Sequence, residues 1–226
     1  MSNLRLSGRR LLAVFLFLLS PASLYAATIY VDSTLSADIT NQTYSIARRN
    51  ATGADGNAYR TVAGAVAAMA AGDTCYIRRG TYNEIGINLS AKTDGTEAHP
   101  YTLSSYPGEW AVIDGKHAST ASDQSILTSY EKTISYWRFI KLEITGGGNL
   151  LTLPNYGAAL HIGAKHCLFQ YLYIHDNYAS QVNAGAAAGV LLLGGSQNNV
   201  VEFCHFAGNG NPLGDVNSAN ANLAIY

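Results

Sequence analysis

Tyrosine, histidine and charged side chains recur about every 30 residues in the C-terminal half of the chain, where they could together bind a sugar. The segments 139–147, 169–177 and 201–209 align with offsets of 30 and 32 residues. The alignment places six polar or aromatic residues on one side of the repeat: Lys141, Glu143, Tyr171, Tyr173, His175 and His205. Tyrosine rings can stack on sugar faces, and charged groups can bind hydroxyls or carboxylates. We therefore expect a glycan-binding face with Tyr171, Tyr173, Glu143 and His205 as its binding residues.

The elements that must position these side chains are short strands. After residue 73 the apolar runs are brief, and Gly, Asn or Asp separates almost all of them. A second apolar run precedes two of the repeats, at 159–163 and 190–195. Two strands with their turns in every 30 or so residues are typical of one coil of a solenoid. Few gaps could hold a crossover helix, so the pattern excludes a doubly wound sheet and predicts an all-β parallel β-helix.

Alternation along a strand predicts which side chains stack from coil to coil. Treating 139–144, 168–174 and 200–206 as single strands, we expect two inward columns: Leu142, Leu172 and Cys204, then Ile144, Ile174 and Phe206. The outward columns are then Lys141, Tyr171 and Phe203, and next to them Glu143, Tyr173 and His205. At the following turn we expect a structural ladder of Gly147, Asn177 and Asn209.

The same alternation makes two negative predictions about catalytic pairs. It places Glu202 inward, out of reach of a substrate. It also sends the neighbours His175 and Asp176 to opposite faces, which argues against a catalytic dyad and for a role in the turn.

One helix is expected, over 59–71. Its apolar stripe consists of Val62, Ala65, Val66 and Met69, with Thr61 as the cap and Gly72 as the stop. A strand stack must close its first coil against water, so we expect this helix to cover the open end.

The composition and the N-terminus indicate an exported protein. A basic start, the apolar run Leu11–Leu19, Pro21 and then small residues predict a signal peptide over 1–26. That run is shorter than the roughly 20 residues that span a bilayer. We expect secretion to the extracellular space or periplasm, no membrane contact after cleavage, and one domain over 27–226. With 13% charged residues and a net charge of −1, no basic field would gather nucleic acid.

The cysteines and two of the histidines are candidate metal ligands by residue type. The three cysteines lack a C-x-x-C spacing and sit in apolar runs, so we predict buried core thiols and no zinc site. His161 and His166 flank the expected turn at 163–164, but no third ligand stands near them in the sequence, so we expect no metal there.

Motifs in residues 55–115 resemble the pectate-lyase-like right-handed parallel β-helix family. They include Asp55-Gly-Asn-Ala-Tyr-Arg-Thr-Val, Ala71-Gly-Asp-Thr, Gly80-Thr-Tyr and Val112-Ile-Asp-Gly. The resemblance implies a capping helix, a Gly-Asp-Thr turn, a Gly-Thr-Tyr hairpin and an Ile-Asp-Gly corner. These motifs build coils and carry no catalytic group, so they are specific for the fold and weak for the activity.

The resemblance also implies a reaction, the β-elimination of acidic polysaccharides. A base removes the proton beside the uronate carboxylate, and a cation, often calcium, stabilises the charge that develops. Our candidates for the base or another catalytic group are Lys141, Lys165, Arg138 and His175. The candidates for calcium binding are Asp176 and Asp215. Calcium takes more oxygen ligands than these supply, so the complete set of catalytic groups cannot be placed from the sequence.

Three functions follow as expectations. The first is a carbohydrate-active relative of polysaccharide lyases that takes acidic rather than neutral glycans. The second is a non-catalytic glycan-binding or structural module, which an aromatic face without a complete ligand set would favour. The third is a glycoside hydrolase, which needs two carboxylates such as Glu143 with Asp176 or Glu202 with Asp215. The strand that begins near Leu223 has no capping segment after it, so we also expect missing C-terminal coils, which could remove activity, or pairing with another chain.

Overall fold

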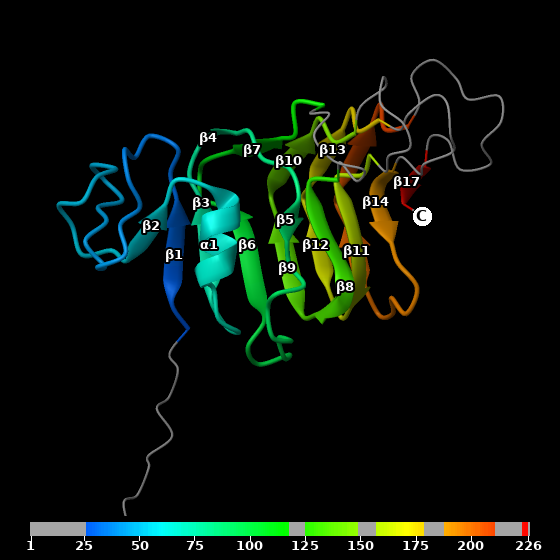
Figure 1. The fold of residues 1–226 in the computed structure, drawn as a ribbon, viewed down its shortest axis with the longest axis horizontal. Helices are drawn as coiled ribbons and strands as arrows, with labels where there is room; N and C mark the ends of the chain where they lie inside the picture. The colour runs from blue at the N-terminus through cyan, green and yellow to red at the C-terminus, as the bar shows by residue number, and fades with distance from the viewer. Residues whose placement is uncertain (1–25, 118–124, 149–156, 179–187, 211–222, 226) are drawn as a thin grey trace, which may run out of the picture.

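The chain forms a right-handed parallel β-helix with one short helix at its N-terminal end, as the repeat predicts (Figure 1). The structure is a computed structural model that describes residues 26–117, 125–148, 157–178, 188–210 and 223–225. Within these residues three parallel sheets, here called the first, second and third walls, enclose the core. From β3 onward each coil contributes one strand to each wall, so equivalent side chains stack along the solenoid.

The strands are short. The first wall contains β1 (Thr28–Val31), β2 (Asn57–Tyr59), β3 (Thr74–Ile77), β6 (Tyr101–Ser105), β9 (Trp137–Ile140), β12 (Leu168–Gln170) and β15 (Val200–Glu202). The second wall contains β4 (Gly80–Tyr82), β7 (Ala111–Asp114), β10 (Leu142–Thr145), β13 (Tyr173–His175) and β16 (His205–Ala207). The third wall contains β5 (Ile87–Asn88), β8 (Leu127–Ser135), β11 (Leu160–Lys165), β14 (Ala188–Leu192) and β17 (Leu223–Ile225).

The register confirms the expected columns. Ile144 pairs with Ile174, and Ile174 pairs with Phe206. Leu142 and Leu172 are buried in the core, and Cys204 packs against it. The interior consists almost wholly of such apolar layers, and burying each large side chain contributes about 1.5–3 kcal/mol. Stacked apolar columns therefore hold the coils together.

The expected long strands are wrong in one respect, because each is two strands separated by a corner. Lys141, Tyr171 and Phe203 have φ angles of 53°, 54° and 54°, in the left-handed region. This turn of the backbone directs the chain from the first wall to the second and interrupts the alternation of side chains. Glu202, expected inward, is therefore half-exposed, and its Oε1 accepts a 2.6 Å hydrogen bond from Gln170 Nε2.

Helix α1 (Val62–Ala68) is shorter than the expected helix over 59–71. Tyr59 belongs to β2, where it pairs with Val31, and Met69 has extended backbone angles that end the helix. The cap is as predicted, because Thr61 Oγ1 accepts a 3.1 Å hydrogen bond from Gly64 N. The expected apolar stripe is buried against the first coil: Val62, Ala65, Val66 and Met69.

The asparagine ladder is present at the turn after the second wall. Asn177 is fully buried, and its Oδ1 accepts a 2.9 Å bond from Gly147 N. Its Nδ2 donates to Asn209 Oδ1 at 2.8 Å, and Asn209 Nδ2 donates to Ile174 O at 2.9 Å. These bonds link three successive coils at the end of the second wall.

An ionic network closes the N-terminal end of the solenoid. The Asp32 side chain is fully buried, and it accepts hydrogen bonds from Arg49 and, at 2.7 Å, from Tyr44 Oη. Arg78 donates to Tyr44 at 3.0 Å and pairs with Glu109 at 2.7 Å. Burial alone would raise the pKa of Asp32, but the bonds from Arg49, Tyr44 and Thr34 outweigh it and lower that pKa to about 2.

Two of the three cysteines are buried in the core, as predicted. Cys75 and Cys167 are buried free thiols as expected, whereas Cys204 is partly exposed. Burial raises the pKa of Cys75 strongly and that of Cys167 to about 11, so both are poor nucleophiles.

Two local predictions were wrong. His161 and His166 do not flank a turn, because β11 runs through 163–164 with only a register shift. The Gly-Thr-Tyr segment is not a hairpin: it is β4, which begins the second wall and pairs in parallel with β7.

No helix among the described residues is long and apolar enough to cross a membrane. The expected signal peptide lies outside the described residues except for Ala26.

Candidate functional site

The outer face of the second wall gathers the residues that the repeat singled out. The column Val112, Glu143, Tyr173 and His205 runs across β7, β10, β13 and β16 in register. Beside it lies a groove of about 460 Å³, here called the aromatic groove, lined by Trp110, Lys141, Tyr171, Leu172, Tyr173, Phe203 and His205. Three of the four predicted binding residues therefore line one groove, and the fourth, Glu143, lies in the adjacent column.

The corners explain why large rings are exposed here. A residue in the left-handed region at a corner projects outward, so Tyr171 and Phe203 leave the core although both are largely apolar. Tyr171 is 49% exposed and Phe203 is 71% exposed, and their rings stack with centroids 5.2 Å apart and planes 14° apart. Exposed apolar rings that gather in one place mark a binding surface more often than a structural one.

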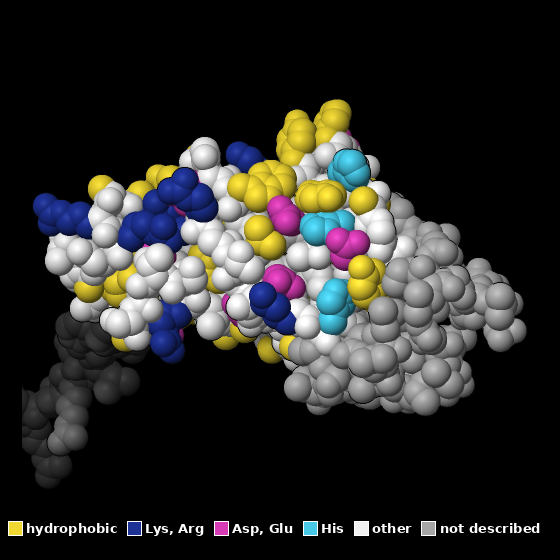
Figure 2. Space-filling model, turned by 90° about the horizontal axis from the view of Figure 1, so that it is seen from above, with side chains coloured by type: hydrophobic (Ala, Val, Ile, Leu, Met, Phe, Trp, Pro, Cys, Tyr) yellow, Lys and Arg dark blue, Asp and Glu magenta, His cyan; other side chains and the backbone are white. Residues whose placement is uncertain are grey.

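Figure 2 looks down on this face and shows how its side chains are distributed. Yellow apolar groups, cyan histidines and magenta carboxylates gather over the same part of the solenoid, while the dark blue cations concentrate toward its N-terminal end. The mixture of rings, carboxylates and imidazoles at one place is suited to a ligand with both apolar faces and hydroxyl groups.

A chain of polar contacts, here called the histidine cluster, borders the groove. Trp110 Nε1 donates to Glu143 Oε2 at 2.7 Å. Glu143 Oε1 lies 3.2 Å from His175 Nε2, and His175 Nδ1 lies 2.8 Å from Asp176 Oδ2. The His175 ring also stacks on Tyr173, with centroids 4.2 Å apart. The four residues therefore hold one another in place and orient one edge of the groove.

The expectation that His175 and Asp176 face opposite ways was wrong, although Asp176 does lie at the turn. The argument assumed an extended backbone through both residues, but β13 ends at His175 and Asp176 has a φ of 52°. The left-handed turn brings the Asp176 carboxylate back beside the imidazole. Both ring nitrogens of His175 then face carboxylates, which favours an orienting role in the site over that of a free base.

The expected bases are not brought together. Lys141 lines the aromatic groove and has no ion-pair partner among the residues that the structure describes. Arg138 lies on the outer face of β9 in the first wall, and Lys165 ends β11 in the third wall. Of the cationic candidates, Lys141 is the one that can reach a ligand in the aromatic groove.

The described residues do not fit a calcium site. Asp176 is engaged by His175, and its other oxygen lies 3.4 Å from Tyr178 Oη. Asp215 lies outside the described residues, and within them no three acidic, histidine or cysteine side chains are close enough to hold a metal ion. Calcium takes six to eight oxygens, so no step of a mechanism can be assigned to it here.

Sequence reasoning missed Trp110 and did not select Phe203 as a binding residue. Trp110 precedes β7, and Ala111 pairs with Leu142, so Trp110 occupies the same corner position as Lys141 one coil earlier. Extending the repeat by one coil toward the N-terminus would have found it. The signal was weak because the segment around Trp110 shares the register but little of the sequence of the later repeats.

Comparisons with known proteins support the assignment of the fold family. Residues 44–220 match the family model described as the Pel9A-like right-handed β-helix region. Pectate lyase PEL9 of Emericella nidulans is 30% identical over 164 residues, which are 69% of this chain and 36% of that protein. The uncharacterized protein YwoF of Bacillus subtilis is 39% identical over 69 residues, 30% of this chain and 14% of that protein.

Among solved structures, pectate lyase Pel9A matches with a TM-score of 0.48 and 17% identity, over 81% of this chain and 50% of that one. The chain therefore spans only 36% of PEL9 and 50% of Pel9A. Since the family model covers well over half of the chain, the protein belongs to the Pel9A-like right-handed β-helix family.

Proposed function

We propose that this protein is a secreted β-helix that binds an acidic polysaccharide in the aromatic groove, with pectate as the first ligand to test. The observation that carries the proposal is the pair of exposed, stacked rings of Tyr171 and Phe203 in a groove that Lys141 also lines. Rings of this kind stack on the apolar faces of sugars, and the cation can take a carboxylate. The family relation to pectate lyases supports a polysaccharide as the partner.

The charges beside the groove support an acidic rather than a neutral glycan. The ammonium group of Lys141 has no carboxylate partner within the described part of the chain. Glu143, by contrast, already accepts from Trp110 and lies beside His175, so both of its carboxylate oxygens have partners. A carboxylated sugar would therefore meet an unpaired cation and a largely satisfied carboxylate.

We further propose that any catalysis is β-elimination with Lys141 as the base. In this step the amine form of Lys141, in equilibrium with the ammonium form that binds a carboxylate, takes the proton from the carbon beside the uronate carboxylate. The electrons of that bond form the carbon–carbon double bond, and the glycosidic oxygen leaves and takes a proton from solvent. His175 and its two carboxylates would orient the edge of the groove without giving up a proton.

Two assays on the same variants test the proposal. The first is pectate binding by calorimetry, and the second is ultraviolet absorbance after incubation with pectate, with and without calcium. Y171A and F203A should each weaken binding about tenfold, because a lost ring stack is worth about 0.5–1.5 kcal/mol plus buried area. Y130A is the control, since Tyr130 is another exposed ring, 45% exposed, that belongs to β8 in the third wall. Unchanged binding in both groove variants would refute the proposed site.

The absorbance assay separates binding from catalysis. A rise in absorbance that disappears in K141M, measured at pectate concentrations that saturate both proteins, would support β-elimination with Lys141 as the base. Binding without any rise would leave the second candidate, a non-catalytic glycan-binding module, which the incomplete ligand set among the described residues favours. New reducing ends without absorbance would indicate a hydrolase that uses Glu143 and Asp176, which lie at opposite nitrogens of His175.

Secretion is part of the same proposal and has its own test. Expression of the full chain in a bacterium with an export pathway should give a mature protein in the periplasm or medium. Mass spectrometry of its N-terminus should place the cleavage near Ala26. A full-length protein that stays in the cytoplasm would contradict the expected signal peptide.

A further inference from the structure

A second groove lies at the opposite end of the first-wall strands from the aromatic groove. It has a volume of about 450 Å³, within the range of small-molecule sites of about 300–1,000 Å³. Its lining is Glu97, Pro100, Tyr136, Arg138, His166, Cys167, Leu168, Asn198 and Val200. Because it lies where the chain passes from the third wall to the first, we call it the entry groove.

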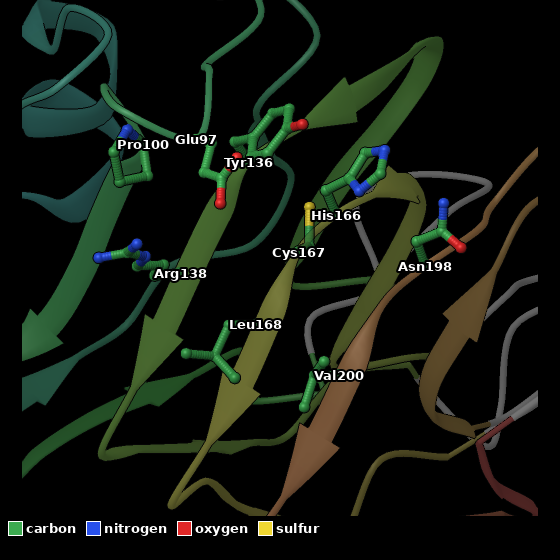
Figure 3. Close-up of a pocket in the computed structure, with 9 residues that line it drawn as sticks. All are labelled: Glu97, Pro100, Tyr136, Arg138, His166, Cys167, Leu168, Asn198 and Val200. Atoms are coloured by element: carbon green, nitrogen blue, oxygen red, sulfur yellow. The ribbon is translucent and has the colours of Figure 1, made fainter.

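The solenoid itself builds the entry groove. Tyr136, His166 and Asn198 occupy equivalent corner positions in three successive coils, and their φ angles are 56°, 53° and 55°. Figure 3 shows these three side chains in a row at the start of β9, β12 and β15. The next outward column lies two residues further along the strands and is in register across them: Arg138, Leu168 and Val200. A ligand in the groove would therefore lie across several coils.

The lining offers an aromatic platform beside an apolar floor. The rings of Tyr136 and His166 stack with centroids 4.9 Å apart and planes 8° apart. Val200 is 49% exposed although nothing polar in its side chain can interact with water. A flat pair of rings next to exposed aliphatic groups is suited to the apolar face of a sugar ring.

The charges around the entry groove are unpaired. Arg138 and Glu97 both line it, yet neither forms an ion pair or a side-chain hydrogen bond with any residue that the structure describes. An arginine fork binds a carboxylate through two parallel hydrogen bonds. A carboxylate such as that of Glu97 accepts hydrogen bonds from hydroxyls, and an amide such as that of Asn198 can accept from them or donate to them. The set therefore matches a ligand with a carboxylate at one edge and hydroxyls at another.

We propose that the entry groove is a second glycan-binding site that takes a uronate residue, with Arg138 bound to its carboxylate. The proposal shares its ligand class with the proposed function but rests on different residues and a different wall. The two grooves lie at the two ends of the same strands, since Tyr136 precedes β9 and Lys141 follows it. Five residues of extended chain separate them by about 16 Å, so one glycan chain could contact both.

The test is calorimetric titration of the full secreted chain with a pectate trimer. A trimer is too short to occupy both grooves at once, so each groove should bind a trimer of its own. The comparison ligand is the same trimer with its carboxyl groups reduced to alcohols. Two equivalents of pectate trimer should bind the wild type. R138Q should remove one equivalent or weaken it at least tenfold, and should leave binding of the reduced trimer unchanged.

Matched variants keep the two grooves distinguishable. Y171A should weaken the equivalent in the aromatic groove about tenfold and leave that in the entry groove unchanged, while R138Q should do the reverse. K165Q is the control, because Lys165 is a cation next to His166 that does not line the groove. Thermal unfolding of every variant checks that the fold is intact.

Each outcome decides between the proposals. Loss with R138Q but not with Y171A would support the entry groove and refute the aromatic groove. Loss with Y171A alone, and a single equivalent in the wild type, would overturn the second site. An equal loss of pectate and reduced trimer in R138Q would also overturn it, because the carboxylate would then play no part. If the wild type bound no pectate trimer, both sites would be refuted.

Discussion

Replacement of Asn177 should be among the most damaging single changes in the C-terminal coils. Its side chain is fully buried and bonds to three groups: Gly147 N at 2.9 Å, His175 O at 2.9 Å and Asn209 Oδ1 at 2.8 Å. N177A would leave the buried Gly147 amide without its acceptor, and it would remove the bonds that Asn177 Nδ2 donates to His175 O and Asn209 Oδ1. Asn209 Oδ1 would keep its bond from the backbone N of Asn177. The stranded amide costs about 1–3 kcal/mol and each of the two lost Nδ2 bonds about 0.5–1.5 kcal/mol, so the free energy of unfolding should fall by about 2–6 kcal/mol.

The position of Asn177 makes the effect measurable at the site as well. Asn177 follows Asp176 directly and bonds to the carbonyl of His175, so it holds the end of β13 where the histidine cluster lies. Loss of the ladder should therefore also weaken glycan binding in the aromatic groove. Urea unfolding followed by tryptophan fluorescence gives the stability, and calorimetry gives the binding.

Two comparison variants sharpen the argument. N209A removes the acceptor of two bonds from Asn177 and the donor to Ile174 O, but it leaves Asn177 bonded to Gly147 and His175. Because Asn209 is half-exposed and water can replace its bonds, this variant should cost less, about 1–3 kcal/mol. N177D keeps the shape and the acceptor for Gly147 but places a carboxylate oxygen against two acceptors, so the loss should shrink at low pH as the carboxylate is protonated. A loss below about 1 kcal/mol for N177A, or a cost equal to that of N209A, would refute the idea that the ladder links the coils.

Two further predictions concern the N-terminal end. The pKa of Asp32 is about 2 in the folded chain against an ordinary value of 3.8, so ionised Asp32 contributes about 2 kcal/mol of stability. Because the folded pKa is the lower one, this stability is present above about pH 4 and is lost as the pH falls toward 2. D32N should be less stable at pH 7 and should lose less stability over that range, as thermal melts from pH 2 to pH 7 would show; a parallel loss in wild type and variant would contradict the assignment. For the helix cap, T61A should cost about 1 kcal/mol while T61S costs little, because the hydroxyl that accepts from Gly64 is retained; equal melting temperatures for all three proteins would show that the cap is not needed.

The sequence predicted the fold because the solenoid repeats its apolar pattern. Ile144, Ile174 and Phe206 could be aligned by spacing alone, and the structure places them in adjacent layers. The Asn177–Asn209 ladder followed from the same alignment, since equivalent turn positions must stack when coils do. The apolar stripe predicted the position of the helix correctly. The predicted ends were wrong, because Tyr59 pairs with Val31 as part of β2.

The candidate site was predicted only in part. Tyr171, Tyr173 and His205 were placed on one outer face from their positions in the repeat, and they do line one groove. The pairing of His175 with Asp176 was missed, and Glu202 was assigned to the wrong side. Both errors have one origin, the left-handed residues at 176 and 203, which break the period of two that the prediction assumed.

By itself, the sequence determined which side chains are buried, because the hydrophobic free energy of a repeated apolar pattern is satisfied only when the repeats stack. The tertiary structure alone decided which polar groups meet in the histidine cluster. Trp110, Glu143, His175 and Asp176 come from three coils, and their contacts depend on where each backbone turns and on the register between strands. A non-glycine residue adopts the left-handed conformation at a cost of roughly 1–2 kcal/mol. The packing of neighbouring coils supplies that energy, and no local sequence signal records it.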